Sequence, residues 1–306
     1  MRVGLVILPQ RRWPELATVW RRGEELGFDH LWTYDHLTWD PLAGSPWGAA
    51  LPTLVAAATV TSRVRLGTWV ASPNYRHPVP FARELAALDD VSGGRAVLGI
   101  GAGGVGHDAR VLGHEVLPPG DRAARLEEFV TLLDRVLVGD HISYAGRFYS
   151  AADARTTLPG PQRPRLPIVV AADGPRLLRL AASAGDGWAT TGGSGPRART
   201  AGDGEQAWWS RVAELAARFT EALDAEGRAA AGVDRMLSLD AGPRFSLTSV
   251  ELFLDSVGRA RELGFTDVVV HWPIPGGPVY DAPEDMVERI ADLLPRLRAR
   301  RPSTPT

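Results

Sequence analysis

Residues 25–34 read ELGFDHLWTY, and residues 262–271, near the other end of the chain, read ELGFTDVVVH. In both stretches an amphipathic segment ends at a Gly, one Phe follows, and a short apolar run begins soon afterwards. Gly27 and Gly264 fit the left-handed backbone position just past a helix, and the Phe can then pack back before a new strand. The two near-copies therefore predict a helix-to-strand turn at opposite ends of the chain.

The same alternation of short apolar runs and longer amphipathic segments continues along all 306 residues. Strands are predicted at Val3–Leu8, His30–Tyr34, Val64–Trp69, Ala96–Ile100, Ile168–Ala171, Gly187–Thr190, Met236–Leu239 and Asp267–His271. Helices are predicted near Trp13–Leu26, Pro52–Thr61, Phe81–Val91, Arg122–Val138, Arg176–Ala184, Gln206–Glu226, Val250–Leu263 and Ala282–Arg298. Eight such units close a (β/α)8 TIM barrel, and the alternation favours a parallel sheet. We predict this α/β fold as one domain over residues 1–301, with a disordered tail over residues 302–306.

Two segments interrupt the alternation. His141–Ser150 places apolar residues on both sides of Ala145-Gly146, which predicts a short hairpin insertion. Thr191–Gly204 is rich in Gly, Arg and Ser and too polar to pack, which predicts a mobile loop at the C-terminal face of the barrel.

The composition narrows the classes of function. The formal net charge of −2 gives no support for a nucleic-acid or membrane-surface partner. Cys and Lys are both absent, which excludes thiolate chemistry and a Schiff-base lysine, and the seven His lack the paired spacing of a metal site. No apolar run of about 18 residues occurs, and Met1 leads directly into a predicted strand. We therefore expect a cytoplasmic protein that acts on a small molecule without a metal.

Reactive residues of a parallel barrel lie on the loops that follow its strands. Asp35 and His36 directly follow the second predicted strand. Because His titrates near neutral pH and a carboxylate can fix its orientation, this pair can position an imidazole for proton transfer. The alternative is a His that only caps the loop through backbone hydrogen bonds.

Three further loops also follow predicted strands. Residues 69–78 (WVASPNYRHP) have no helical period, so this loop either bulges into the barrel mouth to support a flat ligand or simply connects two elements. Residues 99–104 (GIGAGG) contain G-x-G, but no helix opens directly and the dinucleotide fingerprint is not met, which favours close approach of a planar ligand. Residues 172–176 (ADGPR) suit a phosphate at a helix N-terminus, with plain helix initiation as the alternative.

Several motifs, in order, resemble the bacterial luciferase-like superfamily. They are GFDHLWTYDH at 27–36, VRLGT at 64–68, LDDVSGGRAVLGIGAG at 88–103, GPR at 174–176 and AGDGW at 184–188. The resemblance covers nearly the whole chain. It implies a (β/α)8 barrel that uses FMN or the deazaflavin F420, usually as a homodimer.

The loop SPNYRHP at residues 72–78 is more similar to the F420-dependent branch. This branch implies His36 as the catalytic residue and a non-proline cis peptide at Trp69–Val70 behind the deazaflavin ring. The positions expected to bind the cofactor are Asp35, Trp69, Val70, Ser72, Asn74, Gly103, Gly104, His107, Asp173, Gly174, Pro175, Arg176 and Thr191. Trp39 and Trp272 are expected to bind substrate, whereas Trp32 and Trp188 are expected to pack in the core.

The chain departs from the sugar-phosphate dehydrogenases of this branch. It has Gly104 where they place an acidic residue, and it lacks the Lys that grips their substrate phosphate. Sugar-phosphate oxidation is therefore not expected. His107 and Asp108 stand near the vacated position and could supply a proton instead.

Three hypotheses follow. The first is an F420H2-dependent reductase that transfers hydride to a C=C or C=N bond of a small organic substrate, with His36 donating or orienting a proton. The second is an FMNH2-dependent monooxygenase supplied by a partner flavin reductase. The third is a non-catalytic flavin-binding barrel. Fold alone does not separate the three.

Overall fold

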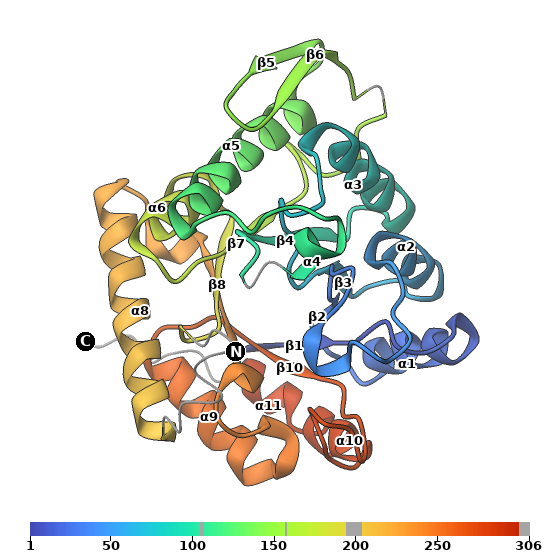
Figure 1. Cartoon of the computed structure of the whole chain (residues 1–306). Helices are drawn as coiled ribbons and strands as arrows, with labels where there is room; N and C mark the ends of the chain where they lie inside the picture. Colours follow the sequence, from blue (N-terminus) through green and yellow to red (C-terminus); the bar gives the residue numbers. More distant parts are fainter. Residues whose placement is uncertain (105–106, 157, 194–203, 300–306) are drawn as a thin grey trace.

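The computed structural model describes residues 1–104, 107–156, 158–193 and 204–299. Eight parallel strands form a closed barrel in the order β1-β10-β9-β8-β7-β4-β3-β2 (Figure 1). Their bounds are β1 Arg2–Val6, β2 His30–Thr33, β3 Arg65–Thr68, β4 Ala96–Gly101, β7 Ile168–Ala171, β8 Gly187–Thr190, β9 Asp234–Ser238 and β10 Asp267–His271. All eight predicted strands are present, which confirms the predicted TIM barrel.

Helices surround the barrel on its outside (Figure 1). The α-helices are α1 Trp13–Glu25, α2 Ala50–Val60, α3 Pro78–Ser92, α4 His107–Val111, α5 Pro119–Val138, α6 Pro175–Ala184, α8 Glu205–Ala225, α9 Val250–Glu262, α10 Met286–Ala291 and α11 Leu294–Ala299. Short 3-10 helices are η1 Asp40–Leu42, η2 Ala230–Gly232, η3 Leu239–Ala241 and η4 Ser246–Thr248. In α5 the residues at three- and four-residue steps, including Leu126, Phe129, Val130 and Leu133, are buried, as the apolar period predicts.

The structure corrects the prediction of one helix over residues 282–298. Two helices, α10 and α11, replace it, with a break after Ala291. Pro295 has no N–H to bond the carbonyl of Ala291, and its ring would clash with that carbonyl in a continuous helix. The apolar pattern runs through the break, so periodicity alone did not reveal it.

The predicted hairpin is present and extends further than residues 141–150. It consists of β5 Ile142–Ala145 paired antiparallel with β6 Ser150–Ala154. The Glu128 carboxylate on α5 accepts backbone N–H groups from the hairpin turn, which fastens the hairpin to that helix. Most of the predicted mobile loop, residues 194–203, and the predicted tail, residues 302–306, lie outside the described residues.

Both predicted helix-to-strand turns are confirmed. Gly27 and Gly264 have φ values of +84° and +82°. Phe28 and Phe265, which follow them, are both buried in the layer between helices and strands. The local signal was sufficient here because a left-handed Gly and its apolar neighbour form a self-contained turn.

Glycines make room for a large aromatic ring inside the barrel. Trp32 projects from β2 into the interior, where it joins an inner cluster with Val6, Trp69 and Met236. A Cβ added to Gly67 on the adjacent β3 would lie 2.4 Å both from the Trp32 ring and from the carbonyl oxygen of Val97. Neither can withdraw, because the ring is fully enclosed and the carbonyl is backbone.

We therefore expect Gly67→Ala to lower the free energy of unfolding by about 2–3 kcal/mol, the upper range for overpacking a core. Urea unfolding followed by circular dichroism measures the change. Gly258→Ala is the matched control, because Gly258 lies within α9 with open space around its Cα, and Ala there should raise stability by about 0.5–1 kcal/mol. Equal stability of both variants would contradict the proposed packing constraint.

A buried ionic cluster lies at the N-terminal end of the strands. Asp267 on β10 is completely buried, and its carboxylate lies 3.0 Å from Nε2 of His30 and accepts a hydrogen bond of 2.6 Å from Arg2. Arg2 also pairs with the partly exposed Asp234. Burial alone would raise the pKa of Asp267, but the hydrogen bonds and charges of His30 and Arg2 outweigh it and hold this pKa well below its ordinary value.

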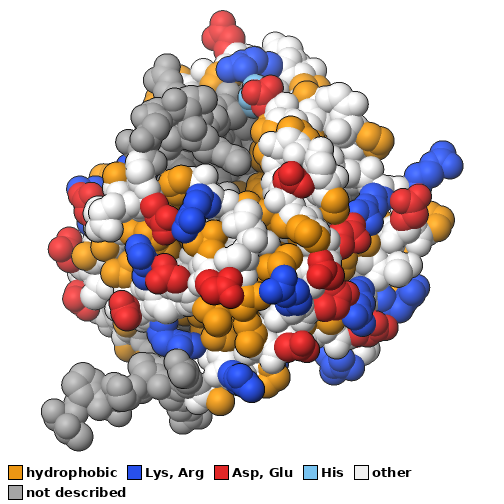
Figure 2. Space-filling model, turned by 90° about the horizontal axis from the view of Figure 1, so that it is seen from below, with side chains coloured by type: hydrophobic (Ala, Val, Ile, Leu, Met, Phe, Trp, Pro, Cys, Tyr) orange, Lys and Arg blue, Asp and Glu red, His pale blue; other side chains and the backbone are white. Residues whose placement is uncertain are grey.

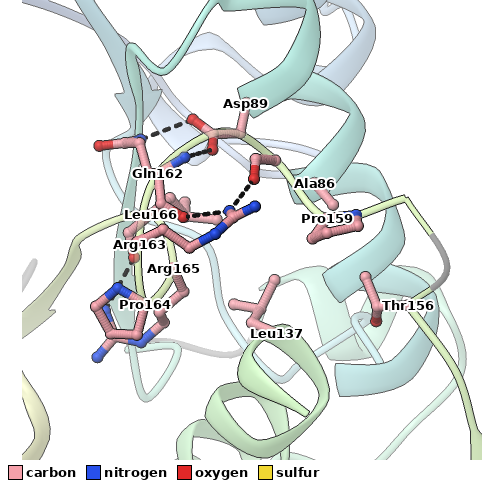
Figure 3. Close-up of a pocket in the computed structure, with 11 residues that line it drawn as sticks. Ala86, Asp89, Leu137, Thr156, Pro159, Gln162, Arg163, Pro164, Arg165 and Leu166 are labelled. Carbon is pink, nitrogen blue, oxygen red and sulfur yellow. Dashed lines mark hydrogen bonds between the residues drawn. The ribbon is translucent and has the colours of Figure 1, made fainter. Parts of the chain in front are cut away.

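A small pocket under α3 also lies at this end of the barrel (Figure 3). Gln162 donates to the Asp89 carboxylate and to the carbonyl of Ala96, the first residue of β4. Its place at the strand N-termini separates this pocket from the loops where a barrel carries its chemistry. On the face shown in Figure 2, acidic and basic side chains are interspersed and no single-sign patch dominates.

Candidate active site

His36 is oriented by a carboxylate from another part of the chain. Its Nδ1 lies 2.8 Å from Oδ2 of Asp108 on α4, and Oδ1 of Asp108 accepts the backbone N–H of Leu37 at 2.7 Å. Asp108 is buried, whereas the His36 side chain is 28% exposed. The structure therefore corrects one prediction: Asp108, not Asp35, fixes the imidazole. Asp108 lies on a short helix that begins at His107 and was not predicted.

Asp35 is engaged elsewhere. Its buried carboxylate accepts two hydrogen bonds from Arg76, at 2.7 and 3.1 Å, and a third from the hydroxyl of Tyr75. Burial, reinforced by the charge of Asp35, raises the pKa of Tyr75 above its ordinary value, so this phenol remains a hydrogen-bond donor. Asp35 thus ties the loop after β3 to the end of β2, and its expected role in cofactor binding stays a prediction.

The loop after β3 runs close to the ends of β3 and β4. The Trp69–Val70 peptide is cis, as the family resemblance implies. Trp69 faces the barrel interior, with its ring centroid 5.1 Å from that of Trp32. Val70 borders the glycines of β4, since a Cβ on Gly99 or Gly101 would meet its methyl groups at 3.2 and 3.1 Å. These glycines therefore make room for the half-buried Val70 side chain, which covers them.

Ser72, Asn74 and Gly103 pack together farther along the loops after β3 and β4. Ser72 and Asn74 are buried, and a Cβ on Gly103, whose φ is +74°, would lie 2.3 Å from the Asn74 amide nitrogen. Only Gly fits at position 103, because both the backbone angle and the space exclude a side chain. Gly104, by contrast, has open space around it.

Two arginines that contact Gly103 and Asn74 were not predicted as site residues. Arg122 donates to the carbonyl of Gly103 at 2.7 Å, and Arg125 donates to the side-chain oxygen of Asn74. The Nε atoms of both are buried without a hydrogen-bond partner, and no carboxylate among the described residues forms an ion pair with either. Burial lowers the pKa of Arg125. The available signal was a pair of arginines spaced three residues apart in the first turns of a predicted helix.

The start of α6 lies across from α5. Gly174 is the N-cap of this helix, Pro175 follows it, and Gly174 has open space around its Cα. Arg176 makes a bidentate ion pair with Glu127 of α5. Asp173 accepts a hydrogen bond from Thr190, and burial raises the pKa of Asp173 despite this bond. The structure thus brings residues 173–176 next to α5.

Of the remaining predicted residues, some lie at the C-terminal end of the strands and one does not. Thr191 follows β8 and is half-buried, and His107 lies 3.9 Å from the carboxylate of Asp40. Trp39 stacks on Tyr280, with centroids 6.0 Å apart, at the C-terminal end of the strands. Trp272, expected to bind substrate there, packs in the outer layer beside Leu16 and Val19 of α1.

The difference between Trp39 and Trp272 follows from strand geometry. Successive side chains of a strand point to opposite faces, so His271 points into the barrel and Trp272 points toward α1. Trp32 and Trp188 are 1% and 0% exposed, which confirms that both pack in the core.

A second missed group lies at the same end of the barrel. The hydroxyl of Tyr34, directly before Asp35, is 2.8 Å from Nε2 of His271 and 3.0 Å from the hydroxyl of Tyr280. Nδ1 of His271 lies 2.9 Å from the carboxylate of Asp240. The sequence feature that could have revealed this group is His271 at the last position of a strand. By alternation from the inward-facing Val269, its side chain points into the barrel.

A family model described as luciferase-like monooxygenase matches residues 1–241. The chain belongs to the luciferase-like monooxygenase family. A curated relative, the F420-dependent glucose-6-phosphate dehydrogenase of Amycolatopsis mediterranei, is 30% identical over 314 residues, covering 91% of this chain and 92% of that protein. The family resemblance stated from the motifs is thereby confirmed.

Solved structures share the fold of this luciferase-like chain. An F420-dependent secondary alcohol dehydrogenase in complex with an F420-acetone adduct has a TM-score of 0.76 at 17% identity, covering 97% of this chain and 99% of that one. A monooxygenase from Streptomyces bottropensis has a TM-score of 0.72 at 19% identity, covering 97% and 98%. At such identities the likeness concerns the barrel alone.

Across the described ranges, no helix combines the length and apolarity needed to span a membrane. The same residues contain no group of three or more His, Cys, Asp or Glu side chains placed to hold a metal ion.

Proposed function

We propose that this luciferase-like protein is an F420-dependent oxidoreductase that transfers hydride between the deazaflavin and a C=C or C=N bond of a small organic substrate. The observation that carries the proposal is the imidazole of His36 on the loop after β2, oriented by the carboxylate of Asp108 at 2.8 Å. The F420-dependent relative that spans 91% of the chain supports the choice of cofactor.

The residues present fit such a cofactor. The half-buried Val70 side chain, seated on Gly99 and Gly101, offers an apolar contact for its ring. The buried, partnerless Nε atoms of Arg122 and Arg125 supply positive charge for its anionic part, together with the start of α6 at residues 174–176. When bound, reduced F420 supplies a hydride and does not activate oxygen.

The protein's own part in the reaction is acid–base chemistry and positioning. His36 exchanges a proton with the substrate, since its Nδ1 is held by Asp108 and its Nε2 is left for the reacting partner. Asp35 and Arg76 join the loops after β2 and β3, which helps to hold the segment that carries His36. Trp39 contributes an aromatic wall for the substrate.

Titration of the purified protein with F420 and with FMN tests the cofactor assignment, with binding followed by fluorescence quenching. We expect F420 to bind and FMN to bind at least tenfold more weakly. Tight FMN binding without F420 affinity would overturn the proposal. Glucose 6-phosphate is tested as a substrate as well, because the curated relative is named for it. We expect no reduction of F420 with this substrate. The chain has Gly104 where that branch is expected to have an acidic residue, and it has no Lys to bind the substrate phosphate.

The alternative function is an FMNH2-dependent monooxygenase supplied by a partner flavin reductase, which the family description and the solved monooxygenase favour. Substrate-dependent oxygen uptake with FMNH2 would support it. A non-catalytic flavin-binding barrel predicts instead that His36→Ala leaves every measured property unchanged. The homodimer and the cytoplasmic location stay predictions, which sedimentation and cell fractionation test.

Arg125→Met should weaken F420 binding by about 10–100-fold. A charge-assisted hydrogen bond contributes about 1.5–3 kcal/mol, and each 1.4 kcal/mol is roughly a factor of ten in the dissociation constant. Fluorescence titration measures the change. Arg135→Met, on the exposed far end of the same helix, is the matched control and should bind F420 like the unaltered protein. An unchanged affinity in Arg125→Met would remove this residue from the cofactor site.

A further inference from the structure

Tyr34, His271 and Asp240 form a continuous hydrogen-bonded chain at the C-terminal end of the barrel. It runs from the Tyr34 hydroxyl to Nε2 of His271 at 2.8 Å, and from Nδ1 of His271 to Oδ2 of Asp240 at 2.9 Å. His271 and Asp240 are 1% and 3% exposed. The proposed hydride transfer, which relies on His36, assigns no role to this buried chain.

The surroundings of Asp240 determine where the protons lie. Its Oδ1 accepts both the backbone N–H and the hydroxyl of Ser246, and its Oδ2 accepts the backbone N–H of His271 at 2.6 Å. A carboxylate held by these donors acts as an acceptor, so Nδ1 of His271 carries a proton. In the neutral imidazole Nε2 is then an acceptor, and the Tyr34 hydroxyl donates to it.

Tyr280 holds both ends of this arrangement. Its ring stacks on the His271 ring with centroids 3.8 Å apart and an interplanar angle of 9°, which fixes the plane of the imidazole. Its hydroxyl is 3.0 Å from that of Tyr34. Because the Tyr34 hydrogen points to His271, the Tyr280 hydroxyl donates to the Tyr34 oxygen and would stabilise negative charge there.

Tyr34 is the end of the chain that reaches the candidate site. It is half-buried, and its ring meets those of His36 and Trp39 edge-on, with centroids 5.8 and 5.2 Å apart. The hydrogen bonds from Tyr34 through His271 to Asp240 therefore join a phenol at the barrel mouth to a buried imidazole–carboxylate pair. This is the arrangement that lets a weakly acidic hydroxyl exchange a proton, with a base behind it and a third group orienting the base.

We propose that Tyr34 is a second acid–base residue of this site, with His271 and Asp240 as positioning residues that relay its proton. The proposal rests on the proposed function for its hydride. In the direction of reduction, His271 first takes a proton from solvent and becomes the imidazolium, with Nδ1–H on Asp240 and Nε2–H on the Tyr34 oxygen. Tyr34 then gives its hydroxyl proton to the substrate atom adjacent to the one that would receive the hydride of bound F420H2, and takes the Nε2 proton of His271 in its place. His271 is left neutral with Nδ1–H on Asp240; one hydride and one proton are added across the double bond, and oxidation is the reverse.

The competing role is structural, since the same bonds tie β10 to β2 across the barrel. A first experiment separates the two without any cofactor. Histidine labelled with nitrogen-15 reports the tautomer of each ring, and His271→Asn assigns the His271 signals. We expect the Nδ1–H tautomer at neutral pH, with Nε2 moving toward an unbonded acceptor in Tyr34→Phe but not in Tyr144→Phe, a hairpin control. The opposite tautomer would overturn the relay.

A second experiment measures single-turnover oxidation of F420H2 with a panel of α,β-unsaturated carbonyl compounds and cyclic imines. Tyr34→Phe keeps its ring and should slow hydride transfer about 100-fold, with F420 affinity within about twofold of the unaltered protein. His271→Asn should also slow it and should abolish the solvent deuterium isotope effect, which loss of a structural tie would not do. His141→Asn, on the hairpin, is its matched control.

The outcomes are distinct. Tyr34→Phe turning over at the unaltered rate, or an unchanged isotope effect in His271→Asn, would overturn the relay while leaving the proposed function in place. Failure of the unaltered protein to bind F420 would overturn the proposed function, and the tautomer measurement would still decide whether the proton chain exists.

Discussion

Replacing His36 by Asn is expected to slow hydride transfer between F420H2 and substrate by about 10²–10⁴-fold, the usual contribution of a positioned general acid or base. Asn keeps a polar side chain near Asp108 but cannot exchange a proton. Because Val70, Arg122 and Arg125 are unchanged in this variant, F420 affinity should stay within about twofold. Stopped-flow oxidation of F420H2, with the best compound of the same panel, measures the rate.

His141→Asn provides the control for this substitution, because His141 lies exposed on the hairpin and pairs with Asp153 there. It should leave the rate unchanged. Asp108→Asn should show an intermediate loss, since its amide can still hold Leu37 but no longer stabilises the imidazolium form of His36. Full activity in His36→Asn would remove the imidazole from the reaction and favour Tyr34 as the sole acid–base residue.

The second large effect concerns stability. Asp267→Asn is expected to lower the free energy of unfolding by about 3–5 kcal/mol at neutral pH, because it leaves Arg2 and His30 without their shared buried carboxylate. Urea unfolding followed by circular dichroism measures it. Asp234→Asn is the matched control: it removes a carboxylate from the same Arg2, but one that is 30% exposed, so the loss should be about 1 kcal/mol or less.

The lowered pKa of Asp267 predicts how the stability difference between the unaltered protein and Asp267→Asn depends on pH. The pKa of Asp267 in the folded chain lies below its unfolded value, which is about 3.9. The stabilisation is therefore fully present above that unfolded pKa and is lost as the pH falls through the lower, folded value. The stability gap between the unaltered protein and Asp267→Asn should stay constant from neutral pH to about pH 5 and narrow only in stronger acid. A gap that widens on acidification would contradict the assignment.

The candidate site was only partly predictable. His36 could be singled out because a His just after a barrel strand stands where barrels place their chemistry. Its partner could not: Asp35 was the neighbour in sequence, but Arg76 and Tyr75 occupy its carboxylate, and Asp108 arrives from 72 residues away. Spacing along the chain cannot show which of two carboxylates contacts the imidazole, because that contact depends on how distant segments come together in the fold.

The helix-to-strand turns at Gly27 and Gly264 could be predicted from the sequence alone. So could the barrel, because the sequence contains eight strand–helix units. Each of these features depends on neighbouring residues, through a left-handed Gly, an apolar period or a strand alternation. Only the tertiary structure decided which side chains meet at the barrel mouth. Tyr34 and His271 lie 237 residues apart, and they touch because closing the barrel sets β1 between β2 and β10, bringing the ends of those two strands together. Proton chemistry needs contact within about 3 Å, and local patterns carry no such distance.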